Sequence, residues 1–129
     1  MAYSNSAGMT PVPFVAGGTI SANRVVELDS SGNVTAANAI ADEAIGVALT
    51  AAASGDQVQV QIGGIAKITA SAAVSIGDAV MVTASGSGKV STSSGATALD
   101  VGIALEAAAA DGDVIAVLLR PALRSAANT

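Results

Sequence analysis

The sequence contains no cysteine and no histidine, and these absences remove several classes of function. Without cysteine, the chain has neither a disulfide framework nor a thiolate metal site. Without histidine, it lacks both the commonest general base and the commonest metal ligand of proteins.

Aromatic residues are almost absent, with no tryptophan, one phenylalanine and one tyrosine in 129 residues. Valine, isoleucine, leucine and alanine must therefore fill the core of what this length predicts to be one domain. A buried valine, isoleucine or leucine contributes about 1.5–3 kcal/mol, whereas ordering the backbone of one residue costs about 1–2 kcal/mol. We expect an isolated chain of marginal stability, and hence a homo-oligomer whose interfaces supply part of the stability.

Positive charge is also scarce, since five basic residues face ten acidic ones and the net charge is −5. The basic residues form no stripe along the sequence, which argues against a nucleic-acid partner. The sequence contains no run of about 18 apolar residues, so we predict no membrane span. The first residues, MAYSNSAGMTPVP, lack the charged and apolar regions of a signal peptide, so we expect a soluble protein made and used without secretion.

What the chain does contain is a sequence that occurs twice. The stretch IGVALTAAASGDQVQVQI, residues 45–62, resembles VGIALEAAAADGDVIAVLL, residues 101–119. An offset of 56 positions pairs Gly46 with Gly102, Leu49 with Leu105, Val58 with Val114 and Ile62 with Leu118. Upstream the offset is 54, pairing Val26 with Val80 and Leu28 with Val82, because the turn ASGSG is longer than its counterpart DSSG. We therefore predict two β-rich units, about 14–62 and 65–119.

Within these units, short apolar runs alternate with turn residues, which is typical of strands. RVVEL at 24–28 precedes a type I turn, DSSG at 29–32, and residues 45–50 read as a strand buried on both faces. In QVQVQI the alternation predicts that Val58, Val60 and Ile62 face the core and the glutamines face outward. Only ANAIADEA, residues 37–44, has a helix-like composition. The predicted fold is mainly β, one compact sandwich or barrel-like domain with at most one or two helical turns.

The two ends of the chain differ from the β units. Residues 1–13 are small and polar and include Pro11 and Pro13, which favour an extended arm. The arm is either disordered or becomes ordered on a partner, by joining a sheet edge or by lying in a groove. Phe14 and Val15 would anchor its root. We divide the chain into this arm, a β domain at 14–120, and a tail at 121–129 that begins with a strand-stopping proline.

No catalytic constellation is recognisable. Asp111-Gly112-Asp113 and the segment Asp29 to Asn33 each resemble fragments of a calcium loop, but both lack the full ligand series, and Asp-Gly is ordinary turn chemistry. Asp42-Glu43 has no nucleophile beside it, and the serines lack the GxSxG and SxxK contexts that activate them. We expect no catalytic, metal or cofactor-binding residues.

A cofactor-carrier domain is one alternative, because carriers of biotin or lipoate also combine two hairpin-rich halves. They present the modified lysine at a hairpin tip, whereas Lys67 lies within an alternating strand in IGGIAKITAS. A second alternative is a phage or bacterial surface or fibre module that binds glycans or a host.

Several motifs occur in an order that resembles a known family. They are VVELDSSGNV, AIGVALTAAASGDQVQVQIGGIAKI, SIGDAVMV and DVGIALEAAAADGDVIAVLL, within Phe14 to Arg120. In this respect the chain is similar to the small head decoration, or cement, proteins of tailed bacteriophages.

The resemblance implies a structural, non-enzymatic role on the virion. Such proteins form trimers, bind the outer surface of a capsid shell of the HK97-like fold at threefold or quasi-threefold positions, and bridge neighbouring units of the major capsid protein. They often reach the shell with an N-terminal arm. By this resemblance, the capsid-binding residues would be Tyr3, Met9, Pro11, Pro13 and Phe14.

Overall fold

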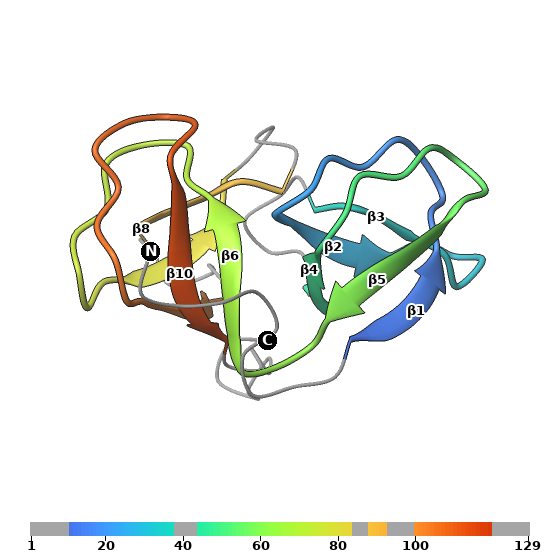
Figure 1. Cartoon of the computed structure of the whole chain (residues 1–129), viewed down its shortest axis with the longest axis horizontal. Coiled ribbons are helices and arrows are strands. Elements are labelled where there is room, and N and C mark those ends of the chain that lie inside the picture. Colours follow the sequence, from blue (N-terminus) through green and yellow to red (C-terminus); the bar gives the residue numbers. More distant parts are fainter. Residues whose placement is uncertain (1–10, 38–43, 84–87, 93–99, 120–129) are drawn as a thin grey trace.

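The computed structural model describes residues 11–37, 44–83, 88–92 and 100–119, and these residues form two five-stranded antiparallel sheets (Figure 1). In spatial order, the first sheet contains β1 (Val12–Val15), β5 (Gln57–Gln61), β4 (Gly46–Ala48), β2 (Arg24–Leu28) and β3 (Val34–Ala36). The second contains β6 (Ile65–Thr69), β10 (Val114–Leu119), β9 (Asp100–Ala104), β7 (Ala79–Val82) and β8 (Val90–Thr92). The predicted fold class, mainly β with two tandem units, is confirmed.

The two sheets have the same strand order. Adding five to each strand number turns the first order, β1-β5-β4-β2-β3, into the second, β6-β10-β9-β7-β8. Strand register agrees with this correspondence. Val26 lies opposite Gly46, and Val80 lies opposite Gly102. We call two residues at such matching places counterparts.

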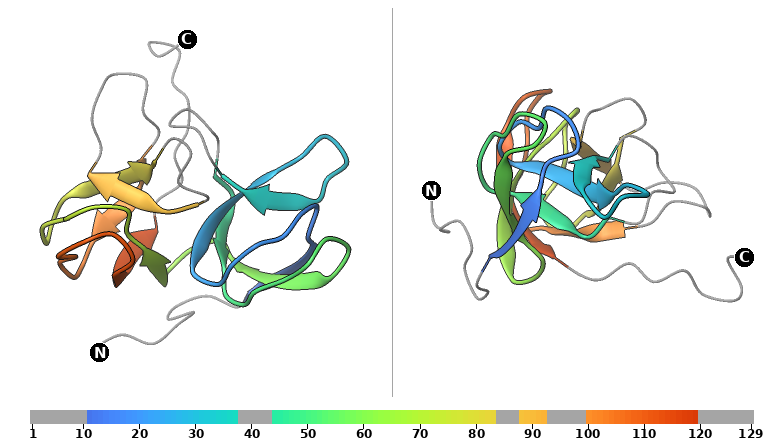
Figure 2. Two further views of the ribbon diagram at one scale, coloured as in Figure 1. Left: turned by 90° about the horizontal axis from the view of Figure 1, so that it is seen from above. Right: turned by 90° about the vertical axis from the view of Figure 1, so that its right-hand side faces the viewer.

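Each sheet curls until the two strands at its edges meet, β1 and β3 in the first sheet and β6 and β8 in the second (Figure 2). In the first unit the amide of Gly17 donates to the carbonyl of Val34 over 2.8 Å, and in the second the amide of Ser71 donates to Val90 over 2.8 Å. Each unit is thus a small barrel-like sheet with a seam, which lies between β1 and β3 in one unit and between β6 and β8 in the other. Within the described ranges, no helix is long and apolar enough to cross a membrane.

The alternating strand β5 differs from its prediction at its last residues. Val58 and Val60 are buried as predicted, but Gln61 is completely buried and Ile62 is 43% exposed. The reason is that β5 ends at Gln61, so the chain leaves the sheet before Ile62 reaches the core. The Gln61 side chain instead turns inward, and its Nε2 donates to the carbonyls of Gly63 and Ile65 over 2.7 and 2.8 Å.

The predicted correspondence between the last strands of the two units, β5 and β10, is also wrong by one residue. Val58 lies opposite Phe14, whereas Ile115, not Val114, lies opposite Ile68 on the matching strand of the second unit. The loop AAAADGD before β10 has one alanine more than AAASGD before β5, which raises the offset from 56 to 57. Consequently Ile115 and Leu119, rather than Val114 and Leu118, are the counterparts of Val58 and Ile62.

The apolar core consists of two clusters, and one of them joins the units. One cluster fills the first unit, around residues such as Ile20 and Val60. The other fills the second unit but also includes Val25, Ala37 and Val47 from the first unit. Strand β6 packs against β2 and β4 along this boundary. The shared cluster holds the two units together as one folded body. The predicted helical stretch falls largely on residues 38–43, outside the described residues.

Candidate functional site

The described chain begins and ends at the same end of the molecule, beside the connection between the two units (Figure 1). Val12 lies opposite Val60 near the end of β5, and Leu118 lies opposite Ile65 at the start of β6. The amide of Leu119 donates to the carbonyl of Gly64 over 2.8 Å. We call this region, residues 11–12, 61–65 and 118–119, the junction end.

The junction end exposes large apolar side chains. Ile62 is 43% exposed and Leu118 is 41% exposed. The segments 61–65 and 114–119 contain no charged residue. An end of the molecule that exposes apolar side chains and carries no charge in these segments is a candidate surface for contact with another macromolecule. Sequence reasoning missed this surface, because it placed Ile62 in the core.

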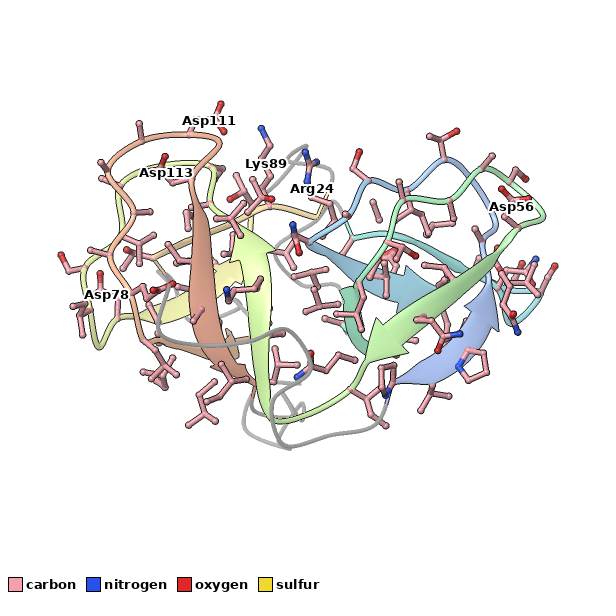
Figure 3. The ribbon with its side chains drawn as sticks, viewed as in Figure 1. Arg24, Asp56, Asp78, Lys89, Asp111 and Asp113 are labelled. Atoms are coloured by element: carbon pink, nitrogen blue, oxygen red, sulfur yellow. The ribbon has the colours of Figure 1, made fainter. Side chains whose placement is uncertain are left out.

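The opposite side of the molecule carries charged loops. Arg24, Asp56, Lys89, Asp111 and Asp113 follow the edge away from the junction end (Figure 3). Lys89 Nζ and Asp111 Oδ1 form an ion pair at 2.9 Å, with the aspartate side chain 63% exposed. Such an exposed pair contributes little to stability. The two ends of the molecule therefore offer chemically different surfaces, one apolar and one charged.

The aspartates that resemble calcium-loop fragments close backbone turns. Asp29 Oδ1 accepts hydrogen bonds from the amides of Ser31 and Asn33 over 2.8 and 3.0 Å. Asp113 Oδ2 accepts from the amides of Ala109 and Ala110 over 2.7 and 3.2 Å. No group of three or more acidic, histidine or cysteine side chains that could hold a metal ion occurs in the part of the chain that the structure describes. Asp42-Glu43 lies outside the described residues.

Comparison with known proteins assigns the family. The family model described as phage cement protein matches residues 5–119. The chain belongs to the phage cement protein family. Among solved structures, it is similar to the N base of head fiber gp8.5 of bacteriophage phi29, with a TM-score of 0.70 and 18% identity over 87% of this chain and 94% of that one. No curated protein sequence matches.

Membership in the cement family places the chain on the exterior of the virion capsid, in a capsid-stabilising role. The family is one of structural proteins and not of enzymes. The likeness to the phi29 fibre base, at this low identity, concerns the fold alone.

Of the five predicted capsid-binding residues of this cement protein, three lie in the part of the chain that the structure describes. Tyr3 and Met9 lie outside the described residues. Pro11 is half-buried at the junction end, and Pro13 is exposed on β1, an edge strand that tolerates a residue without an amide donor. Phe14 is half-buried and packs against the core cluster of the first unit.

Lys67, the residue on which the carrier alternative depended, lies in the middle of β6 opposite Ala116. It is 8% exposed. A carrier lysine must swing between active sites, and this position offers it no hairpin tip from which to do so.

Proposed function

We propose that this cement protein binds as a homotrimer to the outer surface of a phage head at threefold or quasi-threefold positions, and holds neighbouring copies of the major capsid protein together without performing any chemistry. The observation that carries the proposal is the family match over residues 5–119. The exposed apolar junction end, next to the point where the N-terminal segment enters the β domain, supports it.

The junction end is the surface that faces the shell in this proposal. Val12, at the start of β1, lies opposite Val60, two residues before Ile62, so an arm that contacts the shell would bring this end of the β domain, with the exposed Ile62 and Leu118, toward it. Burial of apolar surface contributes about 25 cal/mol per Å². The predicted arm contacts, Tyr3, Met9, Pro11, Pro13 and Phe14, then extend the same footprint.

Three symmetric contacts per trimer explain how weak individual contacts hold a shell. Linked contacts raise the apparent affinity by about 10²–10⁴ over a single contact. A protein that binds only the assembled lattice stabilises that lattice by mass action. The trimer thus strengthens a shell without a large interface at any one point.

Binding to heads tests the function directly. Purified full-length protein is mixed with heads that lack it, in expanded and unexpanded forms, and the bound protein is measured by co-sedimentation and located by cryo-electron microscopy. We expect saturable binding, with density at threefold or quasi-threefold positions. Heads that carry no density for this chain would rule the proposal out.

Two variants test the shell-facing surface. Deletion of residues 1–10 leaves β1 complete, because this strand begins at Val12. Ile62→Lys places a charge on the apolar surface. We expect each variant to fold normally and to bind heads at least about tenfold more weakly, which corresponds to a loss of about 1.4 kcal/mol in the total binding free energy. The matched control is Ser54→Lys, at an exposed position in the turn before Asp56, away from the junction end (Figure 3), and it should bind as the wild type does.

A second candidate is a head-surface module that binds glycans or the host. The observation in its favour is the similarity of the fold to the base of a head fibre. Binding of isolated protein to host glycans, with no binding to heads, would favour this candidate over the first.

A further inference from the structure

The two units of one chain meet through a defined backbone interface. Across the boundary, the amide of Thr69 donates to the carbonyl of Asn23 over 2.9 Å, and the amide of Val25 donates to the carbonyl of Gly88 over 2.9 Å. The amide of Gly88 in turn donates to Ala37 over 2.7 Å. The outer face of β2 and β4 therefore covers the seam of the second unit, between β6 and β8.

The seam of the first unit has the same construction but is uncovered. Thr69, on β6, and Val82, on β7 opposite Val90 of β8, lie at or beside the covered seam and are 7% and 1% exposed. Their counterparts in the first unit are Val15, on β1, and Leu28, on β2 opposite Val34 of β3, which are 44% and 49% exposed. Equivalent positions in the two units therefore differ in burial according to whether a neighbouring unit lies against them.

Two glycines show the same difference at the level of the backbone. Gly32 and Gly88 are counterparts with nearly equal φ values of +84° and +85°. A Cβ atom at Gly88 would lie 2.6 Å from the carbonyl oxygen of Val25, across the boundary. A Cβ atom at Gly32 would meet nothing within 4 Å. The second unit is in close contact with a neighbour at this point, and the first is not.

The second unit also has its own version of the covering face. Ala79 and Ile103, on β7 and β9, are the counterparts of Val25 and Val47, and both are half-buried rather than fully buried. Beside them Ile76 is 70% exposed, the highest value among the large apolar side chains of the described residues. This face, residues 76–79 and 103, is the free counterpart of the internal interface.

The free seam and the free face lie at opposite ends of the long axis of the molecule. In Figure 1 the edge strand β1 lies at the right-hand end. In Figure 3 Asp78 lies at the left-hand end, whereas its counterpart Arg24 lies at the boundary between the units. One chain cannot bring its own seam and face together, but two copies arranged head to tail can.

We propose that a second copy of this chain docks its face at residues 76–79 and 103 onto the free seam of the first unit, at Val15, Leu28 and Gly32, and so repeats between chains the interface that exists within one chain. The amide of Val15 then donates to the carbonyl of Gly77, and the amide of Ala79 donates to the carbonyl of Gly32. These are the counterparts of the two internal bonds described above. Val15, Leu28 and Ile76 are removed from water together.

This contact joins two different surfaces, so it is heterologous and either closes into a ring or continues as a filament. Only the number of copies rests on the proposed function. In the proposed homotrimer the contact closes into a ring of three chains, which together contain six units. The docking itself does not depend on shell binding.

Charge placed in the contact tests the proposal. The mass of full-length protein in solution is measured for the wild type, Leu28→Lys and Ile76→Lys. We expect a trimer for the wild type and a monomer for each variant, with unchanged circular dichroism, because both side chains are exposed. Val114→Lys, at an apolar residue that is 37% exposed and lies outside both surfaces, is the matched control and should remain a trimer. Lysine variants that stay trimeric, or a wild type that is monomeric, would overturn the docking.

Cross-linking tests the geometry without weakening the contact. The natural chain has no cysteine, so Val15→Cys combined with Ile76→Cys provides two unique thiols for a short bismaleimide. On a denaturing gel we expect multiples of the 12.2 kDa chain, ending at three if the ring closes, and no such series from either single variant. A series that continues beyond three keeps the docking but contradicts the trimer. No cross-link between chains in a preparation that is trimeric overturns the docking and leaves the proposed function intact.

Discussion

Gly46 on β4 lies directly against the backbone of β5, and Gly102 on β9 lies in the same way against the backbone of β10. A Cβ atom at Gly46 would collide with the carbonyl oxygen of Gln61, and one at Gly102 would collide with the carbonyl oxygen of Leu118. The nearest side-chain atoms are Cγ1 of Val60 at 2.7 Å and Cγ1 of Val117 at 2.9 Å. Both glycines therefore permit the close approach of neighbouring strands in their sheets.

Substitution of these glycines by valine should destabilise the protein to a comparable degree. A backbone carbonyl cannot move away as a flexible side chain can, so we expect Gly46→Val and Gly102→Val each to lower the free energy of unfolding by about 3 kcal/mol. Urea denaturation measures the effect. Gly18→Ala, where a Cβ meets nothing within 4 Å, should change stability by less than about 0.5 kcal/mol. A neutral effect at one site and a severe effect at the other would show that the units are not equivalent.

The boundary between the units can be probed by comparing Gly88→Ala with Gly32→Ala. Both substitutions put a side chain at a positive φ, which costs about 1–2 kcal/mol. Only the alanine at position 88 also collides with Val25 across the boundary, so Gly88→Ala should cost about 1–3 kcal/mol more. Thermal and urea unfolding of the two variants give the difference, which isolates the packing of one unit on the other. Equal losses would contradict close packing at Gly88.

Gln61 should be intolerant of loss of its amide. Its Nε2 satisfies two backbone carbonyls at the turn between the units, while its Oε1 is buried without a hydrogen-bond partner. Gln61→Met keeps the size but removes both hydrogen bonds, and should cost about 1–3 kcal/mol. The control is Gln59→Met, on the exposed face of the same strand, which should stay within about 0.5 kcal/mol.

Replacement of the same residue by glutamate introduces a pH dependence. The carboxylate of Gln61→Glu would face two carbonyl oxygens, so burial and repulsion should raise its pKa in the folded protein above the unfolded value. The folded state then binds more protons, and stability should recover as the pH falls from 7 toward 4. Unfolding curves at several pH values, normalised to the wild type, measure this. A variant whose stability relative to the wild type does not change with pH would contradict the buried placement of Gln61.

The turn aspartates should stabilise the fold through their hydrogen bonds to backbone amides, without calcium. Asp113→Ala removes two hydrogen bonds from backbone amides to a carboxylate, and we expect a loss of about 1.5–3 kcal/mol. Asp111→Ala removes only the exposed ion pair with Lys89 and should cost less than about 1 kcal/mol. Addition of calcium or of a chelator should leave the melting temperature of the wild type unchanged. A rise in that temperature with calcium would restore the metal site that the sequence fragments suggested.

The sequence predicted well where a local pattern is repeated along the chain. The turn at residues 29–32 forms as expected, with the amide of Gly32 donating to the carbonyl of Asp29 over 3.1 Å. Val58 and Val60 were correctly placed in the core. Gln61 and Ile62 were not, because alternation predicts a face only while the strand continues, and no local signal marks the residue at which it ends.

By itself, the sequence determined the class of the protein. Missing cysteine and histidine removed most chemistry, alternating apolar residues specified strands, and the ordered motifs indicated the cement family. Tertiary structure alone decided which equivalent residues are buried. Val82 and Leu28 stand at matching places in similar strands, yet one is 1% exposed and the other 49%. The difference arises because burial depends on what packs against a strand from elsewhere in the chain, and only the second unit has a neighbouring unit against its seam.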